Sequence, residues 1–236
     1  MILRLPRRVE REMLDILAAE DPRSQRSRQD LQRIQRAMAT LPIMQRALDR
    51  GTSGFIPRTL LELGAGDGSL MLRLARRRAE RWPNVSVMLL DRVSLVAPQT
   101  LAGLREVGWT PGVMVTDVFE WLAQSDDPRW DIVVANLFVH HFSPRDLDKL
   151  LVGIAARANV FLCCEPRRSV LALTGSHLIG LLGAGPVTRH DAVSSVHAGF
   201  RAQELSDRWP DPENWTTHEY PAGLFSHIFL AVRRAR

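Results

Sequence analysis

The sequence predicts an α/β fold: a seven-stranded, mostly parallel sheet that ends in an antiparallel C-terminal hairpin and is preceded by an N-terminal helical cap. From Thr59 onward, five short apolar runs alternate with amphipathic helical patterns, which is the order that βα units give. The runs contain few polar positions, as expected for parallel strands buried on both faces. Two more strand-like runs close the chain around a turn at 221–223. We therefore expect a cap over residues 1–55 and the main domain over residues 56–236.

The N-terminal residues differ from the rest because they read as helical throughout. Apolar residues recur at helical spacing in 9–20 (VEREMLDILAAE) and again in 27–41 (SRQDLQRIQRAMATL). Ser27 is the expected N-cap of the second helix, and Pro42 is expected to end or kink it. The GTSG stretch at 51–54 has the composition of a linker into the main domain.

The strands and helices of the main domain follow from the alternation of patterns. Five strands are expected from the runs TLLEL, VSVMLLD, GVMVT, WDIVVANL and VFLCCE, which begin at Thr59, Val85, Gly112, Trp130 and Val160. Amphipathic patterns place helices between the strands, over 69–81, 99–107, 117–124 and 143–158. The hairpin strands are WTTHEY from Trp215 and LFSHIFLAVRR from Leu224, joined by Pro221, Ala222 and Gly223.

Composition favours one globular domain and excludes several classes of protein. The chain has 236 residues, of which 45% are hydrophobic and 24% charged. Its net charge of +5 is scattered among 26 acidic residues without interleaved aromatic side chains, so we expect no nucleic-acid partner. No apolar run approaches the roughly 20 residues that span a bilayer, and MILRLPRRVERE becomes charged too early for a signal peptide. Cys163 and Cys164 are adjacent in an apolar run and form no disulfide framework, so a reducing cytoplasm is expected.

A glycine-rich loop follows the first strand of the main domain. In LLELGAGDGSL the glycines lie at Gly64, Gly66 and Gly68, whereas the dinucleotide-binding fingerprint needs its third glycine one position later. In a dinucleotide site the start of the next helix receives a pyrophosphate. Asp67 and Glu62 would place negative charge beside such a phosphate, so this loop favours a ligand that carries positive charge.

Polar residues end the next three strands as well. Asp91 ends the second strand, and a carboxylate at that place can accept hydrogen bonds from both hydroxyls of a ribose. Asp117 follows the third strand, where it is placed to accept from an adenine amino group, and Asn136 ends the fourth. Since open α/β sheets bind their ligands at the carboxyl ends of the strands, these residues and the glycine loop predict one site.

On these residues the chain resembles the class I S-adenosylmethionine-dependent methyltransferases, which have a Rossmann-like fold. The E/D-x-G-x-G-x-G loop of that family is similar to Glu62–Gly68, its ribose-binding acid to Asp91, and its adenine-contacting acid to Asp117. The antiparallel last strand of the family is similar to the hairpin expected here. The resemblance implies S-adenosylmethionine as cofactor, with Glu62 contacting its methionine part directly or through water. The cofactor residues that it implies are Glu62, Gly64, Ala65, Gly66, Gly68, Asp91, Arg92, Asp117, Val118 and Asn136.

The segment after the fourth strand limits which classes of molecule could accept the methyl group. Enzymes that methylate exocyclic amines of nucleobases carry an Asn/Asp-Pro-Pro-Tyr/Phe motif there, and this chain has NLFV at 136–139, without either proline. The helical N-terminus resembles the lid of small-molecule methyltransferases, and the last third resembles methyltransferase-domain proteins of bacterial secondary metabolism. We therefore expect a small-molecule acceptor, in particular a phenolic or polyketide-like hydroxyl. The alternatives are an RNA or protein methyltransferase on the same core, or a binding protein that keeps the fold without catalysis.

Two adjacent histidines, His140 and His141, lie just past the carboxyl end of the fourth strand. A phenolic hydroxyl, with a pKa of about 10, needs a base, and histidine is the usual base near neutral pH. Neighbouring side chains on a strand face opposite ways, but Ser143 and Pro144 read as the N-cap and first residue of a helix, so the chain turns here. Both histidines are candidates for the catalytic base, and we expect only one of them to act, with His141 slightly preferred and His140 as its structural neighbour. The alternative is that both pack under the following helix.

Three further residues are candidates for contact with the substrate. Glu165 and Arg167 follow the fifth strand, where an arginine can hold a carboxylate or phenolate; the alternative is a structural ion pair between the two. His190 precedes an expected helix whose N-cap is Asp191, and here the alternative is capping alone. The histidines and acids lack the tight spacing of zinc or magnesium ligands, so no metal site is expected. A homodimer is a further expectation.

Overall fold

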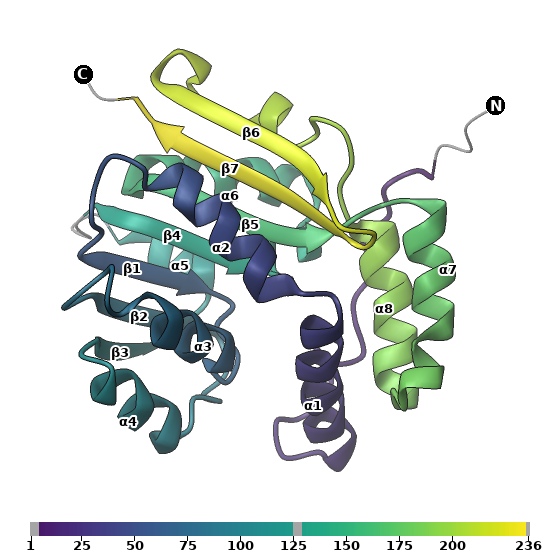
Figure 1. The fold of residues 1–236 in the computed structure, drawn as a ribbon. Helices are drawn as coiled ribbons and strands as arrows, with labels where there is room; N and C mark the ends of the chain where they lie inside the picture. Colours follow the sequence, from purple (N-terminus) through teal and green to yellow (C-terminus); the bar gives the residue numbers. More distant parts are fainter. Residues whose placement is uncertain (1–4, 125–128, 235–236) are drawn as a thin grey trace.

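The sheet has the predicted number and direction of strands. The structure, a computed structural model, describes residues 5–124 and 129–234 (Figure 1). Its strand order is β3-β2-β1-β4-β5-β7-β6, with β1 to β5 parallel and β7 antiparallel to both β5 and β6, which confirms the predicted α/β fold and its C-terminal hairpin. The strands are β1 Thr59–Leu63, β2 Ser86–Asp91, β3 Thr110–Val115, β4 Trp130–Asn136, β5 Ala158–Pro166, β6 Trp215–Ala222 and β7 Ser226–Arg233.

The order of the strands reverses at β1. The chain adds β2 and β3 on one side of β1 and then returns to add β4 and β5 on the other side. Leu61 of β1 is in register with Met88 of β2 and with Val133 of β4, so the loops that follow these three strands meet at one edge of the sheet. Ligands of open α/β sheets bind at the carboxyl ends of the strands beside such a reversal.

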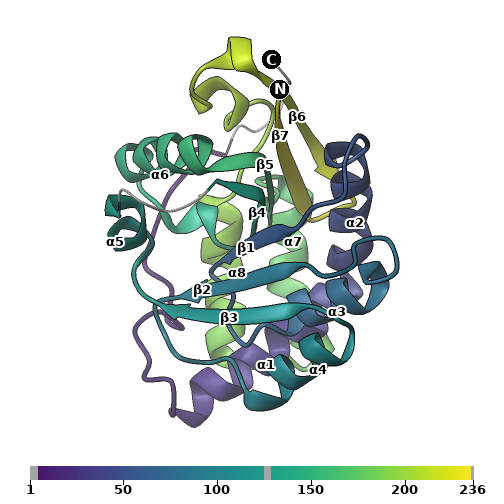
Figure 2. The same cartoon turned by 90° about the vertical axis from the view of Figure 1, so that its left-hand side faces the viewer.

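Alternate residues of each strand enter two cores, one on each face of the sheet. Leu60 and Ile132 pack with side chains of α2 (Thr40–Gly51), α3 (Ser69–Arg78) and α4 (Pro98–Glu106). Their neighbours Leu61 and Val133 pack with α5 (Val118–Ala123) and α6 (Pro144–Arg157) on the other face. Figure 2 shows these two helical layers on either side of the sheet. The helices predicted between the strands are therefore confirmed.

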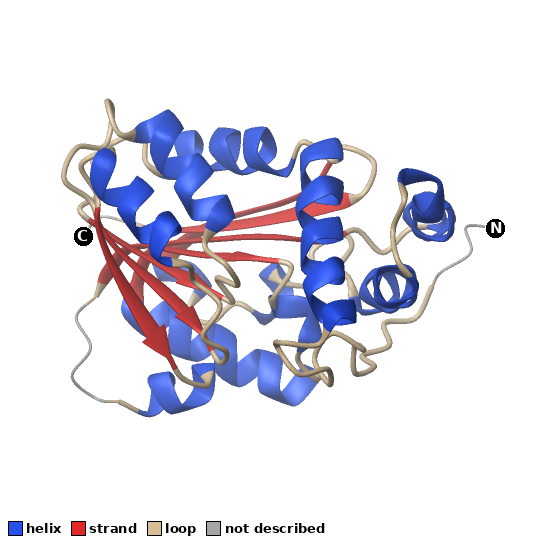
Figure 3. Cartoon of the chain, turned by 90° about the horizontal axis from the view of Figure 1, so that it is seen from below, coloured by secondary structure: helices blue, strands red, loops and turns tan. Residues whose placement is uncertain are grey.

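Three helices lie at the carboxyl edge of the sheet instead of covering one of its faces. They are α1 (Pro22–Ala37), α7 (Val170–Leu178) and α8 (Pro186–Ala198), and α8 packs against both of the others (Figures 1 and 3). Asp30 of α1 accepts hydrogen bonds from the Gly185 N–H at 2.7 Å and the Thr188 hydroxyl at 2.9 Å, which joins α1 to the start of α8. Short 3-10 turns occupy Val139–His141, Ile179–Leu182, Ser206–Arg208 and Pro212–Asn214.

The N-terminal residues depart from the prediction. Residues 9–20 form an irregular segment with short turns instead of a helix, and the first helix begins only after Asp21, which is its N-cap. Ser27 is therefore not a cap, and it lies buried inside α1. The interruption expected at Pro42 occurs earlier, at Ala39, whose backbone is left-handed with φ of 54°. Pro42 itself lies in the first turn of α2, where the N–H that proline lacks has no partner within the helix.

The region after β5 also differs from the sequence prediction. The helix α7 was not predicted because its apolar residues do not form one stripe, and Leu171 and Leu178 are half exposed. The helix α8 begins at Pro186, so Asp191 lies inside it and is not its N-cap. Among the described residues, no helix is both long and apolar enough to cross a membrane.

Candidate active site

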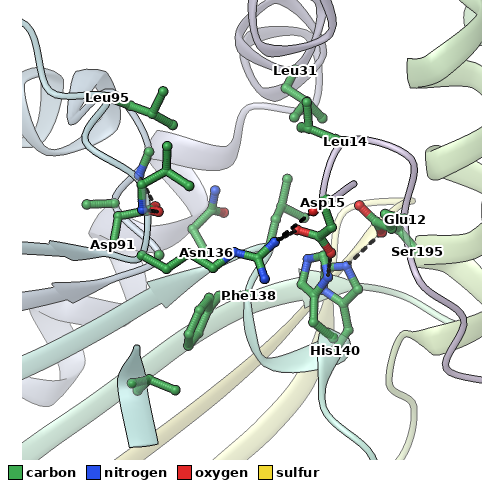
Figure 4. A pocket seen from close by; sticks show the side chains of 18 of the residues that line it. Glu12, Leu14, Asp15, Leu31, Asp91, Leu95, Asn136, Phe138, His140 and Ser195 are labelled. Carbon is green, nitrogen blue, oxygen red and sulfur yellow. Dashed lines mark hydrogen bonds and ion pairs between the residues drawn. The ribbon is translucent and has the colours of Figure 1, made fainter. Parts of the chain in front are cut away.

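A cavity of about 680 Å³ opens at the carboxyl edge of the sheet. Its walls come from the loops after β1, β2, β3 and β4, from α1, and from N-terminal residues between Val9 and Asp15. Figure 4 shows side chains from these separate parts of the chain around one space. All the cofactor residues predicted from the sequence line this cavity except Gly68, which forms the left-handed N-cap of α3.

The glycine loop borders the cavity with backbone conformations that favour glycine. Gly64 and Gly66 both have positive φ, at 67° and 56°. A Cβ on Gly64 would lie 2.4 Å from the Phe138 ring, whereas a Cβ on Gly66 would meet nothing within 4 Å. The loop is therefore closed by Phe138 on one side and open at Gly66, where a ligand can approach the backbone.

The start of α3, which would receive a phosphate in a dinucleotide site, already has an acidic partner. Oδ1 of Asp67 accepts a hydrogen bond from the Ser69 N–H at 3.0 Å. A phosphate at this helix start would therefore meet the Asp67 carboxylate and find the Ser69 N–H already occupied. This geometry agrees with the sequence argument that the loop does not hold a pyrophosphate.

Asp91 connects the glycine loop to the end of β2. Its Oδ2 accepts the Gly66 N–H at 2.8 Å, and its Oδ1 accepts the Val93 N–H at 3.0 Å. A carboxylate oxygen has two lone pairs, so each oxygen keeps one for a hydroxyl of a ligand. Asp117 also has two roles. It is the N-cap of α5, where it accepts the Phe119 N–H at 2.8 Å, and it lines the cavity.

Two polar side chains at the cavity each have a buried oxygen without a hydrogen-bond partner within the described residues. The atoms are Oε2 of Glu62 and Oδ1 of Asn136. Burial of Glu62, together with the charges of Asp67 and Asp91, raises its pKa to about 8. A buried polar atom without a hydrogen-bond partner lowers the stability of the fold, so such an atom usually has a partner from the protein, from water or from a ligand. A ligand with a positive charge and N–H donors, such as the amino group of S-adenosylmethionine, fits this place.

Ligand binding beside Glu62 is expected to release a proton. With a pKa of about 8, the free Glu62 carboxyl is mostly protonated near neutral pH, and a positive group favours its ionised form. The affinity for S-adenosylhomocysteine should therefore rise with pH up to about 8 and then level off. Calorimetric titration in buffers of different ionisation enthalpy measures the proton release. Glu62→Gln should remove both effects, and a pH slope that persists in this variant would contradict the assignment to Glu62.

The histidine pair stands on a turn built around a buried carboxylate. After β4, Leu137 redirects the chain with left-handed backbone at φ 53°. Glu165, from the neighbouring strand β5, accepts the backbone N–H groups of 138–140 and lies 2.6 Å from Nδ1 of His140. The Glu165 side chain is fully buried and is not among the residues that line the cavity. Its partners lie in this turn, which corrects the alternative of an ion pair with Arg167.

His140 is enclosed between two carboxylates. Its Nδ1 faces Glu165. Its Nε2 lies 3.3 Å from Oε1 of Glu12, on the side of the cavity that Figure 4 shows. Burial alone would lower the pKa of His140, but the hydrogen bonds and charges of these carboxylates outweigh burial and raise it to about 9. His140 therefore carries a positive charge near neutral pH and is not available to accept a proton there.

His141 has different surroundings, which suit a base. Its side chain is 26% exposed and lines the cavity, and its Nδ1 lies 3.2 Å from Oδ2 of Asp15. Asp15 also forms an ion pair with Arg92 at 2.7 Å. The imidazole rings of His140 and His141 lie 4.2 Å apart between centroids, with an angle of 35° between their planes. The pair therefore has one enclosed ring and one ring that a ligand can reach.

Glu12 and Asp15 were missed because the sequence placed them in a helix. The irregular segment that carries them is held by α8: Asp191 accepts the N–H groups of 13–14 at 2.8 and 2.9 Å, and Ser195 donates to Glu12. Asp191 thus caps this segment and not α8. The only sequence signal was the presence of acids in a basic stretch, and nothing in that pattern connects them with the histidines.

The other two predicted substrate residues, like Glu165, do not line the cavity. Arg167 is not among its lining residues, and its backbone N–H donates to the Phe225 carbonyl at 2.7 Å. His190 is exposed on α8, 3.0 Å from the carboxylate of Asp191, and it does not line the cavity either. The residues that share the cavity with the glycine loop are therefore the two histidines, Glu12 and Asp15.

Comparison with known proteins finds similarity in structure and not in sequence. The sequence matches no protein-family model and no curated protein. The plantazolicin methyltransferase BpumL in complex with S-adenosylhomocysteine (SAH) superposes with a TM-score of 0.63 and 12% identity, over 91% of this chain and 92% of that chain. An O-methyltransferase family protein from Burkholderia thailandensis gives a TM-score of 0.57 and 14% identity, over 92% of this chain and 61% of that one.

A third solved structure agrees with the first two. Magnesium protoporphyrin IX methyltransferase (ChlM) from Synechocystis PCC 6803 with bound SAH superposes with a TM-score of 0.57 and 16% identity, over 92% of this chain and 96% of that chain. Likeness at such low identity is a statement about the fold. Across most of its length, then, this chain has the fold of these methyltransferases.

Proposed function

We propose that this protein is an S-adenosylmethionine-dependent methyltransferase that methylates a small molecule at a phenolic or polyketide-like hydroxyl. The observation that carries the proposal is the shared cavity, because the glycine-loop site and His141 open into the same space of about 680 Å³. Transfer to a hydroxyl requires a methyl donor and a base held close together. The O-methyltransferase family protein among the similar structures supports oxygen as the methylated atom.

The residues around the glycine loop would hold the cofactor. Asp91 has a free lone pair on each oxygen for the ribose hydroxyls, and Asp117 lies at the end of β3 for the adenine. Glu62 and Asn136 have the unpartnered atoms that suit the methionine part. When bound, S-adenosylmethionine supplies a methyl group on a positively charged sulfur. The acids that line the cavity favour a ligand of that charge.

His141 is the residue that would remove the proton from the acceptor hydroxyl. Asp15 lies against its Nδ1, so it holds the ring in one orientation and stabilises the positive charge that the ring gains. The positive charge on His140 disfavours protonation of His141, because the centroids of the two rings lie only 4.2 Å apart. The carboxylates of Glu12, Glu165 and Asp15 surround the two rings and offset this repulsion.

The charge of the cavity wall favours a small molecule over a nucleic acid. An RNA acceptor would need a basic groove that leads its phosphates to the site. Charged acids still outnumber cations among the lining residues when the mostly protonated Glu62 is left out and the charged His140 is included: they are Glu10, Glu12, Asp15, Asp67, Asp91, Asp117 and Asp146 against Arg11, Arg28, Arg92 and His140. Phosphates would be repelled by such a wall, whereas a phenol without phosphate groups would not.

Two measurements test the proposal. Calorimetric titration with SAH should show binding, and absence of binding would overturn the proposal in favour of a protein that keeps the fold without catalysis. Incubation with S-adenosylmethionine labelled on its methyl group should then label members of a panel of phenols and polyketide-like hydroxyl compounds. Label in RNA or protein, and in none of the small molecules, would overturn the choice of acceptor.

A further inference from the structure

We propose that Glu12, His140 and His141 bind a divalent transition-metal ion at the cavity. One ligand atom from each of these residues lies within 4.8 Å of the others. The ligand pair His140 Nε2 and Glu12 Oε1 is 3.3 Å apart. Two ligands at the usual zinc distances in a tetrahedral site are about 3.4 Å apart, so this pair already has the separation that a bound ion would need.

The surroundings of the two histidines match those of metal ligands. Histidines that bind metal usually hold their other ring nitrogen against a carboxylate, which fixes the ring. Nδ1 of His140 lies 2.6 Å from Glu165, and Nε2 faces Glu12, where a bound ion would replace the proton that the ring carries near neutral pH. Asp15 holds the ring of His141 at Nδ1. Both rings are therefore oriented by acids that come from other parts of the fold.

The donor set also indicates which kind of ion would bind. Two imidazoles and one carboxylate suit zinc, iron(II), cobalt or nickel, whereas magnesium and calcium prefer oxygen ligands. All three residues line the cavity, so three protein ligands would leave a coordination position open toward it. An open position is typical of catalytic sites and not of structural ones.

The ion would act on the acceptor, and this role rests on the proposed function. A divalent ion lowers the pKa of a hydroxyl bound to it, so the hydroxyl proton can leave to solvent near neutral pH. With the ion bound, His141 is a ligand and not the proton acceptor. The sequence analysis predicted no metal site because Glu12 and His140 are 128 positions apart, and no ligand motif covers such a spacing.

Metal binding can be measured without an acceptor. The purified chain is treated with a chelator, dialysed and titrated with Zn²⁺ by calorimetry and with Co²⁺ by visible absorption, at mildly alkaline pH. One ion per chain is expected, with Co²⁺ bands stronger than those of the hydrated ion. Glu12→Gln and His141→Ala should each weaken binding by about tenfold or more, since changes even to partners of metal ligands cost 10–100-fold. His177→Ala, which removes an exposed histidine of α7, should bind like the wild type.

The outcomes distinguish this inference from the proposed function. Binding that is unaffected by Glu12→Gln and His141→Ala, or no binding at all, would overturn the metal site. A thermal unfolding scan of each variant confirms that it is folded before titration. SAH binding is measured in the same chelated samples, because the glycine-loop site does not contain the proposed ligands. Zinc binding without SAH binding supports the ion site and overturns the proposed methyltransferase function. SAH binding without zinc binding supports the proposed function and overturns the ion site.

Discussion

Replacing Asp91 with alanine is expected to weaken SAH binding by about a hundredfold or more, which corresponds to about 3 kcal/mol. The ligand would lose hydrogen bonds from its hydroxyls to a carboxylate, each contributing about 1.5–3 kcal/mol. The Gly66 and Val93 N–H groups would lose the acceptor that holds the glycine loop against β2, at 2.8 and 3.0 Å. Both losses act on the same site, because Asp91 contacts the loop and lines the cavity.

Two companion variants make the Asp91 experiment specific. Asp91→Asn should not restore affinity, because an amide places an N–H donor where a backbone N–H already donates. Asp148→Ala removes an exposed acid of α6 that pairs with Arg208, and it should leave the affinity unchanged. Calorimetric titration with SAH measures all three variants. Wild-type affinity in Asp91→Ala would show that the ligand does not bind at the glycine loop.

The strands of the sheet could be predicted because each one is marked by a short apolar run of neighbouring residues. A strand buried on both faces has little room for polar residues, and β5 is buried at nearly every position. The N-terminal residues show where local patterns fail. The apolar residues in 9–20 have helical spacing, yet Leu14 lines the cavity and Ile16 is 61% exposed. Contacts with distant parts of the chain decide the shape of this segment, and they override its helical pattern.

The shared cavity of the predicted cofactor residues could be foreseen because topology alone brings these residues together. The carboxyl ends of parallel neighbours meet at one edge, which is why Glu62, Asp91 and Asn136 share a cavity. The same rule places Glu165, at the end of β5, near His140, just past the end of β4. The rule gives proximity but not direction, so the sequence assigned Glu165 to the substrate, whereas in the structure it faces the turn that carries the histidines.

The acidic partners of the histidines could not be predicted in this way. Glu12 and Asp15 lie on an irregular segment, and no strand register or helical period fixes where such residues go. Their position depends on Asp191, which anchors the segment from the interior of α8. This anchor joins positions 178 residues apart, so only the folded chain reveals it.

Replacing His141 with alanine is expected to lower turnover by about 10²–10⁴-fold with little change in SAH affinity. The side chain is partly exposed, so the variant should unfold at nearly the wild-type temperature. His140→Ala is the informative comparison, because it leaves Glu12 and Glu165 without the ring between them. The loss of this ring is expected to lower the free energy of unfolding by about 3–5 kcal/mol and Tm by about 6 °C or more. Wild-type turnover in His141→Ala at every pH would contradict a catalytic role for this residue.

Chelation separates the two ways in which His141 can act, because they respond in opposite directions. If His141 removes the proton itself, the chelated wild type keeps its turnover, and Glu12→Gln has a smaller effect than His141→Ala. If an ion bound by Glu12, His140 and His141 acts on the acceptor, the chelated wild type loses turnover and added Zn²⁺ restores it. In that case neither Glu12→Gln nor His141→Ala is restored, because each lacks a ligand. Turnover measured with and without chelator therefore assigns the histidine one role.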